Sequence, residues 1–103
     1  MQAQAIDALR VRAEQGDAEA QLNIAIMYVS GCGVSQDDAE AARWFRRAAE
    51  QGSAEAMTKL GVMCGTGRGV AQDGAEAVRW YRLAADGWRR SAEQGDASAM
   101  TNL

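Results

Sequence analysis

The chain has 103 residues, of which 48% are hydrophobic, 24% are charged and 6% are aromatic, and its formal net charge is -3. This composition is typical of one small globular domain, or of part of a larger one, and excludes a disordered chain. The sequence has no histidine and no excess of basic residues, which excludes imidazole general bases, His-containing metal sites and a broadly basic nucleic-acid surface.

The two cysteines, Cys32 and Cys64, lie too far apart for a Cys-x-x-Cys motif, and we expect ordinary thiols. We therefore expect no metal and no cofactor. No apolar run approaches the length of a membrane span, and the first 16 residues lack the basic and apolar regions of a secretory signal. The chain as given is expected to be cytoplasmic, or periplasmic or secreted if a leader was removed.

The dominant feature of the sequence is an internal repeat. The segment AEQGDAEA at Ala13 recurs as AEQGSAEA at Ala49 and as AEQGDASA at Ala92. The first step is 36 residues, and aligning 13–48 with 49–84 gives about 20 identical positions in 36. A match of this extent at a fixed period indicates repeated structural units.

Each unit is predicted to form two helices. The first helix lies over 18–29 in the first unit and over 54–65 in the second. Asp17 and Ser53 stand at the N-cap positions, each after a glycine that ends the preceding helix. Apolar residues then recur at helical spacing and form one buried stripe: Ala20, Ile24, Met27 and Tyr28. Glycines at positions 31, 33, 67 and 69 are expected to end these helices.

The second helix of each unit is expected to begin at Asp37 or at Asp73. Each aspartate has a glutamate three residues later, Glu40 or Glu76, which predicts a reciprocal Asp-x-x-Glu capping box. The buried stripe of the first copy is Ala41, Trp44, Phe45 and Ala48. Because Trp44 and Trp80 lie on such stripes, we expect them in the core rather than stacked on a ligand.

The two ends of the chain depart from the regular period. Residues 1–12 align with a second helix and are predicted to be half a repeat, followed by repeats over 13–48 and 49–91 and by a truncated repeat over 92–103. The second repeat carries seven extra residues. These extend its second helix through 74–93, or else the helix breaks at Asp86-Gly87 after the loss of most of a repeat. A mid-helix glycine costs only about 1 kcal/mol, which favours one continuous helix.

The order Ala-x-x-x-Ile/Leu-Ala/Gly-x-Met, then Gly-x-Gly-Val, Asp and Trp-aromatic, resembles the Sel-1-like repeat family, which is related to tetratricopeptide repeats. The resemblance agrees with the all-α fold that stacking of the repeated units predicts, an α/α solenoid of helix-turn-helix repeats with a 36-residue period. It also implies an adaptor or scaffold whose concave face, built from the first helices, holds a protein or peptide. Relatives are abundant in bacteria. Some secreted relatives carry a cysteine pair in each repeat, which this chain lacks, so their disulfides are not expected here.

Two motifs resemble a phosphate-binding loop and a catalytic carboxylate pair. The run Gly65-x-Gly67-x-Gly69 follows no strand pattern, so we interpret it as a turn between helices rather than a phosphate loop. The cluster of Asp37, Asp38 and Glu40 occupies the first turn of a helix, where carboxylates favour the macrodipole and cap free N–H groups. We therefore assign no catalytic residues.

Arginines are concentrated on the second helices: Arg43, Arg46, Arg47, Arg79, Arg82, Arg89 and Arg90. They could form a convex stripe for phosphates or an acidic partner, or they could pair with neighbouring glutamates on a solvated surface. We favour the second interpretation.

Positions that differ between the two copies are candidates for partner contact. In the first helices, Asn23, Ile26, Lys59 and Val62 differ from their counterparts and fall away from the buried stripe. We therefore expect these four residues to bind a protein or peptide on the concave face, with no nucleic acid and no membrane span involved.

The sequence leaves two other functions open. A hydrolase-like enzyme is disfavoured because no nucleophile–base pair can be named. A structural fragment that self-associates through its repeat ends is the other alternative, because a solenoid unit buries its apolar face only against neighbours. On this basis we expect the isolated chain to be weakly stable, to fray after about residue 95 and to form homo-oligomers through its ends.

Overall fold

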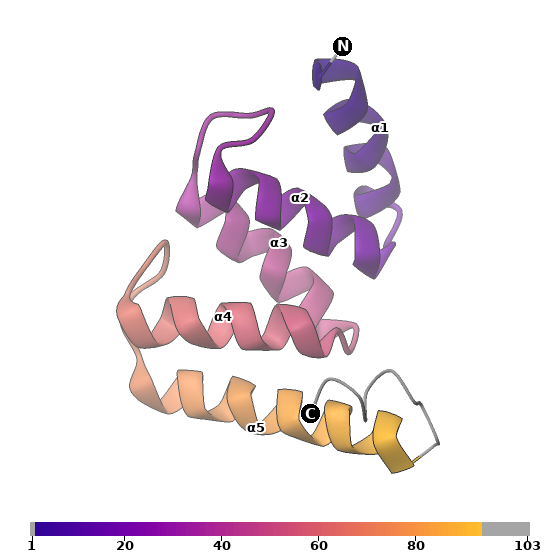
Figure 1. Cartoon of the computed structure of the whole chain (residues 1–103). Helices are drawn as coiled ribbons and strands as arrows, with labels where there is room; N and C mark the ends of the chain where they lie inside the picture. Colours follow the sequence, from indigo (N-terminus) through magenta and orange to yellow (C-terminus); the bar gives the residue numbers. More distant parts are fainter. Residues whose placement is uncertain (1, 94–103) are drawn as a thin grey trace.

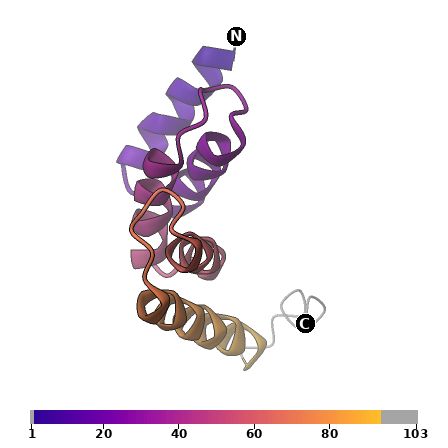
Figure 2. The ribbon, with the colours of Figure 1, turned by 90° about the vertical axis from the view of Figure 1, so that its left-hand side faces the viewer.

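The computed structural model describes residues 2–93, and within this range every regular element is a helix. The helices are α1 (Gln2–Glu14), α2 (Ala18–Ser30), α3 (Asp38–Glu50), α4 (Ala54–Thr66) and α5 (Gly74–Glu93). Each helix packs on the next in chain order. Figures 1 and 2 show the resulting stack, with α1 and α5 at opposite ends. The predicted all-α solenoid of helix-turn-helix repeats is confirmed.

The first helices begin where the sequence predicts, and each ends one residue later than predicted, at Ser30 and at Thr66. Asp17 accepts hydrogen bonds from the backbone N–H groups of Glu19 and Ala20 at 3.1 and 3.2 Å, and the hydroxyl of Ser53 accepts one from Ala56 at 3.2 Å. The guanidinium of Arg12 also contacts Asp17, at 2.7 Å, and it holds the pKa of this carboxyl below its ordinary value. These caps satisfy N–H groups that would otherwise be left free at the helix start.

The second helices confirm one half of the predicted capping box and correct the other. Asp37 and Asp73 each accept a hydrogen bond at 3.0 Å from the N–H three residues later, at Glu40 and Glu76. The reciprocal bond was predicted to run from each aspartate N–H to the glutamate side chain, and that prediction is wrong. The N–H of Asp37 donates instead to the carbonyl of Tyr28, and that of Asp73 to the corresponding carbonyl at position 64.

This difference has a physical cause in the loops. Each loop folds back on the end of its own first helix, where Gly31 and Gly67 adopt the left-handed conformation with φ of 71° and 72°. A free carbonyl at the helix end is then close enough to take the aspartate N–H. The two glutamates are thereby released to pair with arginines.

The loss of the cap on α5 should be measurable. Replacing Asp73 with alanine removes the acceptor of the Glu76 N–H and should lower the free energy of unfolding by about 1 kcal/mol. Urea denaturation followed by circular dichroism gives this value. Asp73→Ser is the control, since serine is also a strong N-cap residue and should retain most of the stability. Equal losses in both variants would show that Asp73 does not act as a cap.

The core lies along the contacts between successive helices and is built from small residues around a few large ones. Phe45, Ile24, Leu60, Gln21 and Cys64 are among its most completely buried side chains. Trp44 and Trp80 are also buried, as predicted. Many of the remaining positions are alanines, which allow the helices to approach closely. The polar member of this group, Gln21, donates to the carbonyl of Ala13 at 2.8 Å.

The longest helix, α5, runs from Gly74 to Glu93 without a break at Gly87. This is the continuous alternative for the extended second helix. The boundaries of the repeats at residues 12, 48 and 91 remain predictions. The expected fraying after about residue 95 lies outside the described residues, as does most of the predicted truncated repeat.

Candidate functional site

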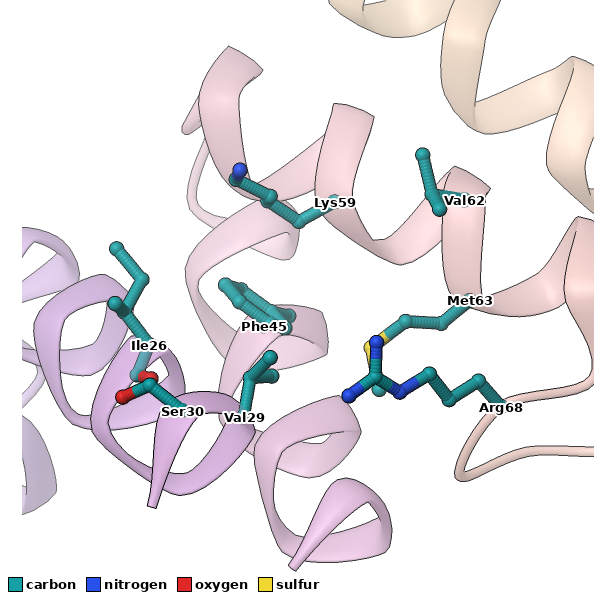
Figure 3. A pocket seen from close by; sticks show the side chains of 8 residues that line it. All are labelled: Ile26, Val29, Ser30, Phe45, Lys59, Val62, Met63 and Arg68. Atoms are coloured by element: carbon teal, nitrogen blue, oxygen red, sulfur yellow. The ribbon is translucent and has the colours of Figure 1, made fainter. Parts of the chain in front are cut away.

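A hollow of about 280 Å³ lies between the two first helices, and we call it the central hollow. It spans both repeats and is formed by three helices and one loop. Helices α2 and α4 supply its walls, α3 supplies its floor, and the loop after α4 closes one side (Figure 3). Its lining residues are Ile26, Val29, Ser30, Phe45, Lys59, Val62, Met63 and Arg68.

Helical spacing explains why these side chains meet. On α2, Ile26, Val29 and Ser30 are three and four residues apart and therefore share one face of the helix. On α4, the three lining residues that begin at Lys59 have the same spacing. The two faces are offset by three residues within the repeat, and the one equivalent pair that they share is Ile26 and Val62. The repeat thus places matching apolar side chains on both walls.

The floor and the rim of the central hollow differ in exposure. Phe45 is only 2% exposed, while Ile26 and Val62 are 38% and 47% exposed. A buried ring therefore lies beneath two aliphatic side chains that reach solvent. Such an arrangement offers apolar surface to a partner without a further change in the core.

The structure brings together three of the four predicted contact residues. Ile26, Lys59 and Val62 line the central hollow, whereas Asn23 does not. Asn23 is exposed on α2 at the position equivalent to Lys59. The assignment of these four residues to partner binding remains a prediction.

Five lining residues were not predicted as contact residues: Val29, Ser30, Phe45, Met63 and Arg68. Val29 and Ser30 could have been found from their spacing to Ile26 on the same helix. Phe45 and Met63 lie on stripes assigned to the core, and both are in fact buried. Arg68 lies in a loop, where only the difference from Cys32 at the equivalent position could have drawn attention to it.

The cations at the central hollow are held differently. The Nε of Arg68 lies 2.8 Å from Oδ2 of Asp38, a contact that joins the loop of the second repeat to the start of α3 in the first. Lys59 is exposed and makes no ion pair with the residues that the structure describes. No carboxylate lines the central hollow. Its rim is therefore locally positive on a chain of net charge -3.

The arginines of the second helices mostly meet acidic or aromatic neighbours. Arg43 pairs with Glu40 at 3.3 Å, and Arg46 pairs with Glu76 at 3.2 Å across the two repeats. The guanidinium of Arg47 stacks over Trp44, 4.5 Å from the ring centre. These contacts agree with the favoured interpretation of a salt-bridged surface. A second hollow of about 390 Å³ lies there, lined by Ala39, Ala42, Arg43, Arg46, Arg47, Gly69 and Val70.

Both cysteines are free, with Cys32 exposed and Cys64 buried. Burial, together with the nearby charge of Glu76, raises the pKa of the Cys64 thiol and so favours its unreactive protonated form. Between residues 6 and 90, whose side chains the structure describes, no three side chains of the metal-binding types gather closely enough to hold an ion. Nor does this part of the chain contain a helix with the length and apolar character needed to cross a bilayer.

Comparison with known proteins decides the family. The family profile described as Sel1 repeat matches residues 18–53 and 54–87, which is more than half of the chain. The chain belongs to the Sel1 repeat family. A comparison with curated proteins found no match. The two matched segments begin at α2 and α4, so that each Sel1 repeat contains one helical hairpin.

Solved structures of Sel1 repeat proteins share this fold. A Sel1 repeat protein from Oxalobacter formigenes is 39% identical over 92% of this chain and 36% of its own length, with a TM-score of 0.79. A protective antigen of uropathogenic Escherichia coli with an SLR fold is 33% identical over 96% of this chain and 27% of its own, also with a TM-score of 0.79. The chain thus spans well under two thirds of either protein.

A third structure is similar in fold alone. Helicobacter pylori cysteine rich protein B is 19% identical and superposes over 100% of this chain and 72% of its own length, with a TM-score of 0.80. The agreement at so low an identity supports the solenoid architecture of the Sel1 repeats.

Proposed function

We propose that this chain is a non-catalytic scaffold that binds a protein or peptide in the central hollow, on the concave face formed by the first helices. Sel1 repeat proteins are generally protein-interaction scaffolds. The observation that carries the proposal is the pair of exposed aliphatic side chains, Ile26 and Val62, above the buried ring of Phe45. Apolar contacts of this kind supply most of the binding energy at protein interfaces.

The lining of the central hollow favours binding over catalysis. Its hydroxyl group, on Ser30, already donates to the carbonyl of Ile26 at 2.9 Å. The other polar lining groups are the cations of Lys59 and Arg68, which are poor general bases while protonated. A hydrolase-like function therefore has no supporting group at this site.

A double substitution in the central hollow tests the proposal. Ile26→Asp together with Lys59→Glu makes the net charge of the rim more negative by three units and removes apolar contact area. We expect capture of the cellular partner by the full chain to fall about tenfold or more, because a buried unpaired carboxylate is costly at an interface. Quantitative affinity capture from the source cell, with circular dichroism to verify helicity, measures this effect.

The matched control places the same changes on α1 and α5, outside the central hollow. Val11 and Arg82 are exposed, and Val11→Asp with Arg82→Glu alters the net charge by the same amount. This control should bind the partner as the parent chain does. Full binding by the Ile26/Lys59 variant would move the site elsewhere, and the arginines of the second helices would be examined next.

Self-association is the second candidate function, and one observation favours it. Helix α5, at the end of the described stack, exposes Val78, Tyr81 and Leu83. Exposed apolar side chains on a terminal helix can pack against another copy. Sedimentation over a wide concentration range separates the two candidates, since a scaffold that acts as a monomer keeps one mass throughout.

A further inference from the structure

The central hollow combines a small apolar cavity with positive charge, and this combination narrows the kind of partner that fits. Its volume of about 280 Å³ lies at or below the range of roughly 300–1,000 Å³ that encloses drug-sized ligands. A cavity of this size accommodates an anchoring side chain more readily than a whole small molecule. The lining around Phe45 and Met63 is apolar and would accept an aliphatic or aromatic anchor.

The charges lie on either side of this anchor position. Figure 3 shows Lys59 and Arg68 on opposite sides of the Phe45 ring. Arg68 pairs with Asp38 at 2.8 Å and remains half exposed. Lys59 is the single lysine of the chain, and it makes no ion pair with the described residues. Lys59 is therefore the cation best able to accept a new carboxylate, and Arg68 is the second.

The net charge of the chain strengthens the preference of the central hollow for an acidic partner. The chain has a net charge of -3, so that at long range the molecule as a whole repels an acidic partner. The central hollow has two cations and no carboxylate in its lining, and it is one place where such a partner is attracted. Charge complementarity of this kind guides orientation and selects among partners more than it adds affinity.

We propose that the occupant of the central hollow is an acidic peptide segment of another protein, in which one apolar side chain is flanked by carboxylates. The apolar side chain enters between Ile26 and Val62 and rests on Phe45. One flanking carboxylate pairs with Lys59, and the carboxylate on the other side faces Arg68. This inference rests on the proposed function, since it names the chemistry of the partner for that same surface.

Three synthetic peptides test the inference with the full chain. The first has the sequence Gly-Glu-Asp-Leu-Asp-Glu-Gly with blocked ends. The second replaces its acids with the matching amides, and the third replaces its leucine with serine. Titrations followed by amide chemical shifts at low and at physiological salt measure each affinity. We expect the first peptide to bind at the residues of the central hollow, and the other two to bind at least about fivefold more weakly.

Two variants, each of which lacks one positive charge, locate the interaction. Lys59→Met removes the charge and keeps the apolar stem, and it should weaken binding of the first peptide about two- to fivefold, more at low salt than at high salt. Arg82→Met removes one positive charge from α5 and should leave the affinity unchanged. Binding of the amide peptide as tight as that of the acidic one, or no effect of Lys59→Met, would overturn the inference.

The outcomes also distinguish this inference from the proposed function. If the first peptide causes no shift at millimolar concentration, while Ile26→Asp with Lys59→Glu still abolishes capture of the cellular partner, the acidic chemistry is wrong and the scaffold function stands. If neither the peptide nor the cellular partner depends on the central hollow, both proposals fail.

Discussion

Replacement of Phe45 with alanine is expected to lower the free energy of unfolding by about 3–5 kcal/mol. The ring is 2% exposed and packs in the core beneath the central hollow, so its removal leaves a cavity that the surrounding helices cannot fully fill. A domain of this size has a total stability of about 5–15 kcal/mol, and the loss would be a large part of it. Urea denaturation monitored by circular dichroism measures the effect.

The internal repeat offers a matched control for this prediction. Tyr81 occupies the position equivalent to Phe45 but is 41% exposed. Its ring lies over Gly61, where an added Cβ would come within 2.8 Å of it. Tyr81→Ala should therefore cost less than half as much as Phe45→Ala. Equal losses at the two positions would show that burial between the repeats does not determine their contributions.

The second large effect is expected at Gly69. This residue has a φ of +76°, and a Cβ built on it would lie 2.4 Å from the carbonyl oxygen of Asp38. Alanine would thus suffer both an unfavourable backbone conformation, about 1–2 kcal/mol, and a clash with the backbone of the preceding repeat, about 1–3 kcal/mol. We expect Gly69→Ala to lower the free energy of unfolding by about 2–5 kcal/mol in the same urea assay.

Gly33 is the equivalent position in the first repeat and serves as the comparison. Its φ is similar, +82°, but the nearest atom to an added Cβ is the terminal methyl of Met27 at 3.1 Å. Because a methionine side chain can move aside, Gly33→Ala should show the backbone cost of about 1–2 kcal/mol alone. A loss at Gly33 as large as at Gly69 would argue that contact with Asp38 is unimportant.

The architecture could be predicted from the sequence because the repeat appears twice. A glycine or an N-cap residue that recurs after 36 positions indicates a helix end with more certainty than a single occurrence does. The start of α2 after Asp17 and the start of α4 after Ser53 are such a pair, and both are found as predicted. Local hydrogen-bonding chemistry was sufficient there, since the interacting groups lie within three residues of each other.

Features that depend on contacts between segments could not be predicted in the same way. The predicted hydrogen bond from the Asp37 N–H to the Glu40 side chain is not formed, because the carbonyl of Tyr28, nine residues earlier in the chain, accepts that N–H instead. Phe45 was placed correctly in the core, but its second role beneath the central hollow depends on the spacing of α2 and α4. Arg68 required knowledge of where its loop lies relative to Asp38.

The polar contacts between the repeats have a consequence for how the chain folds. Three of them join Gln51 to Gln21, Arg46 to Glu76 and Arg68 to Asp38, and each spans 30 residues. Among the side-chain hydrogen bonds of residues 6–90, none links positions farther apart than this. Closure of a loop costs entropy that grows only slowly with its length, and all of these loops are equally short. Contact order is therefore low, and folding can start at either hairpin and spread to its neighbour on the microsecond-to-millisecond scale of helical proteins.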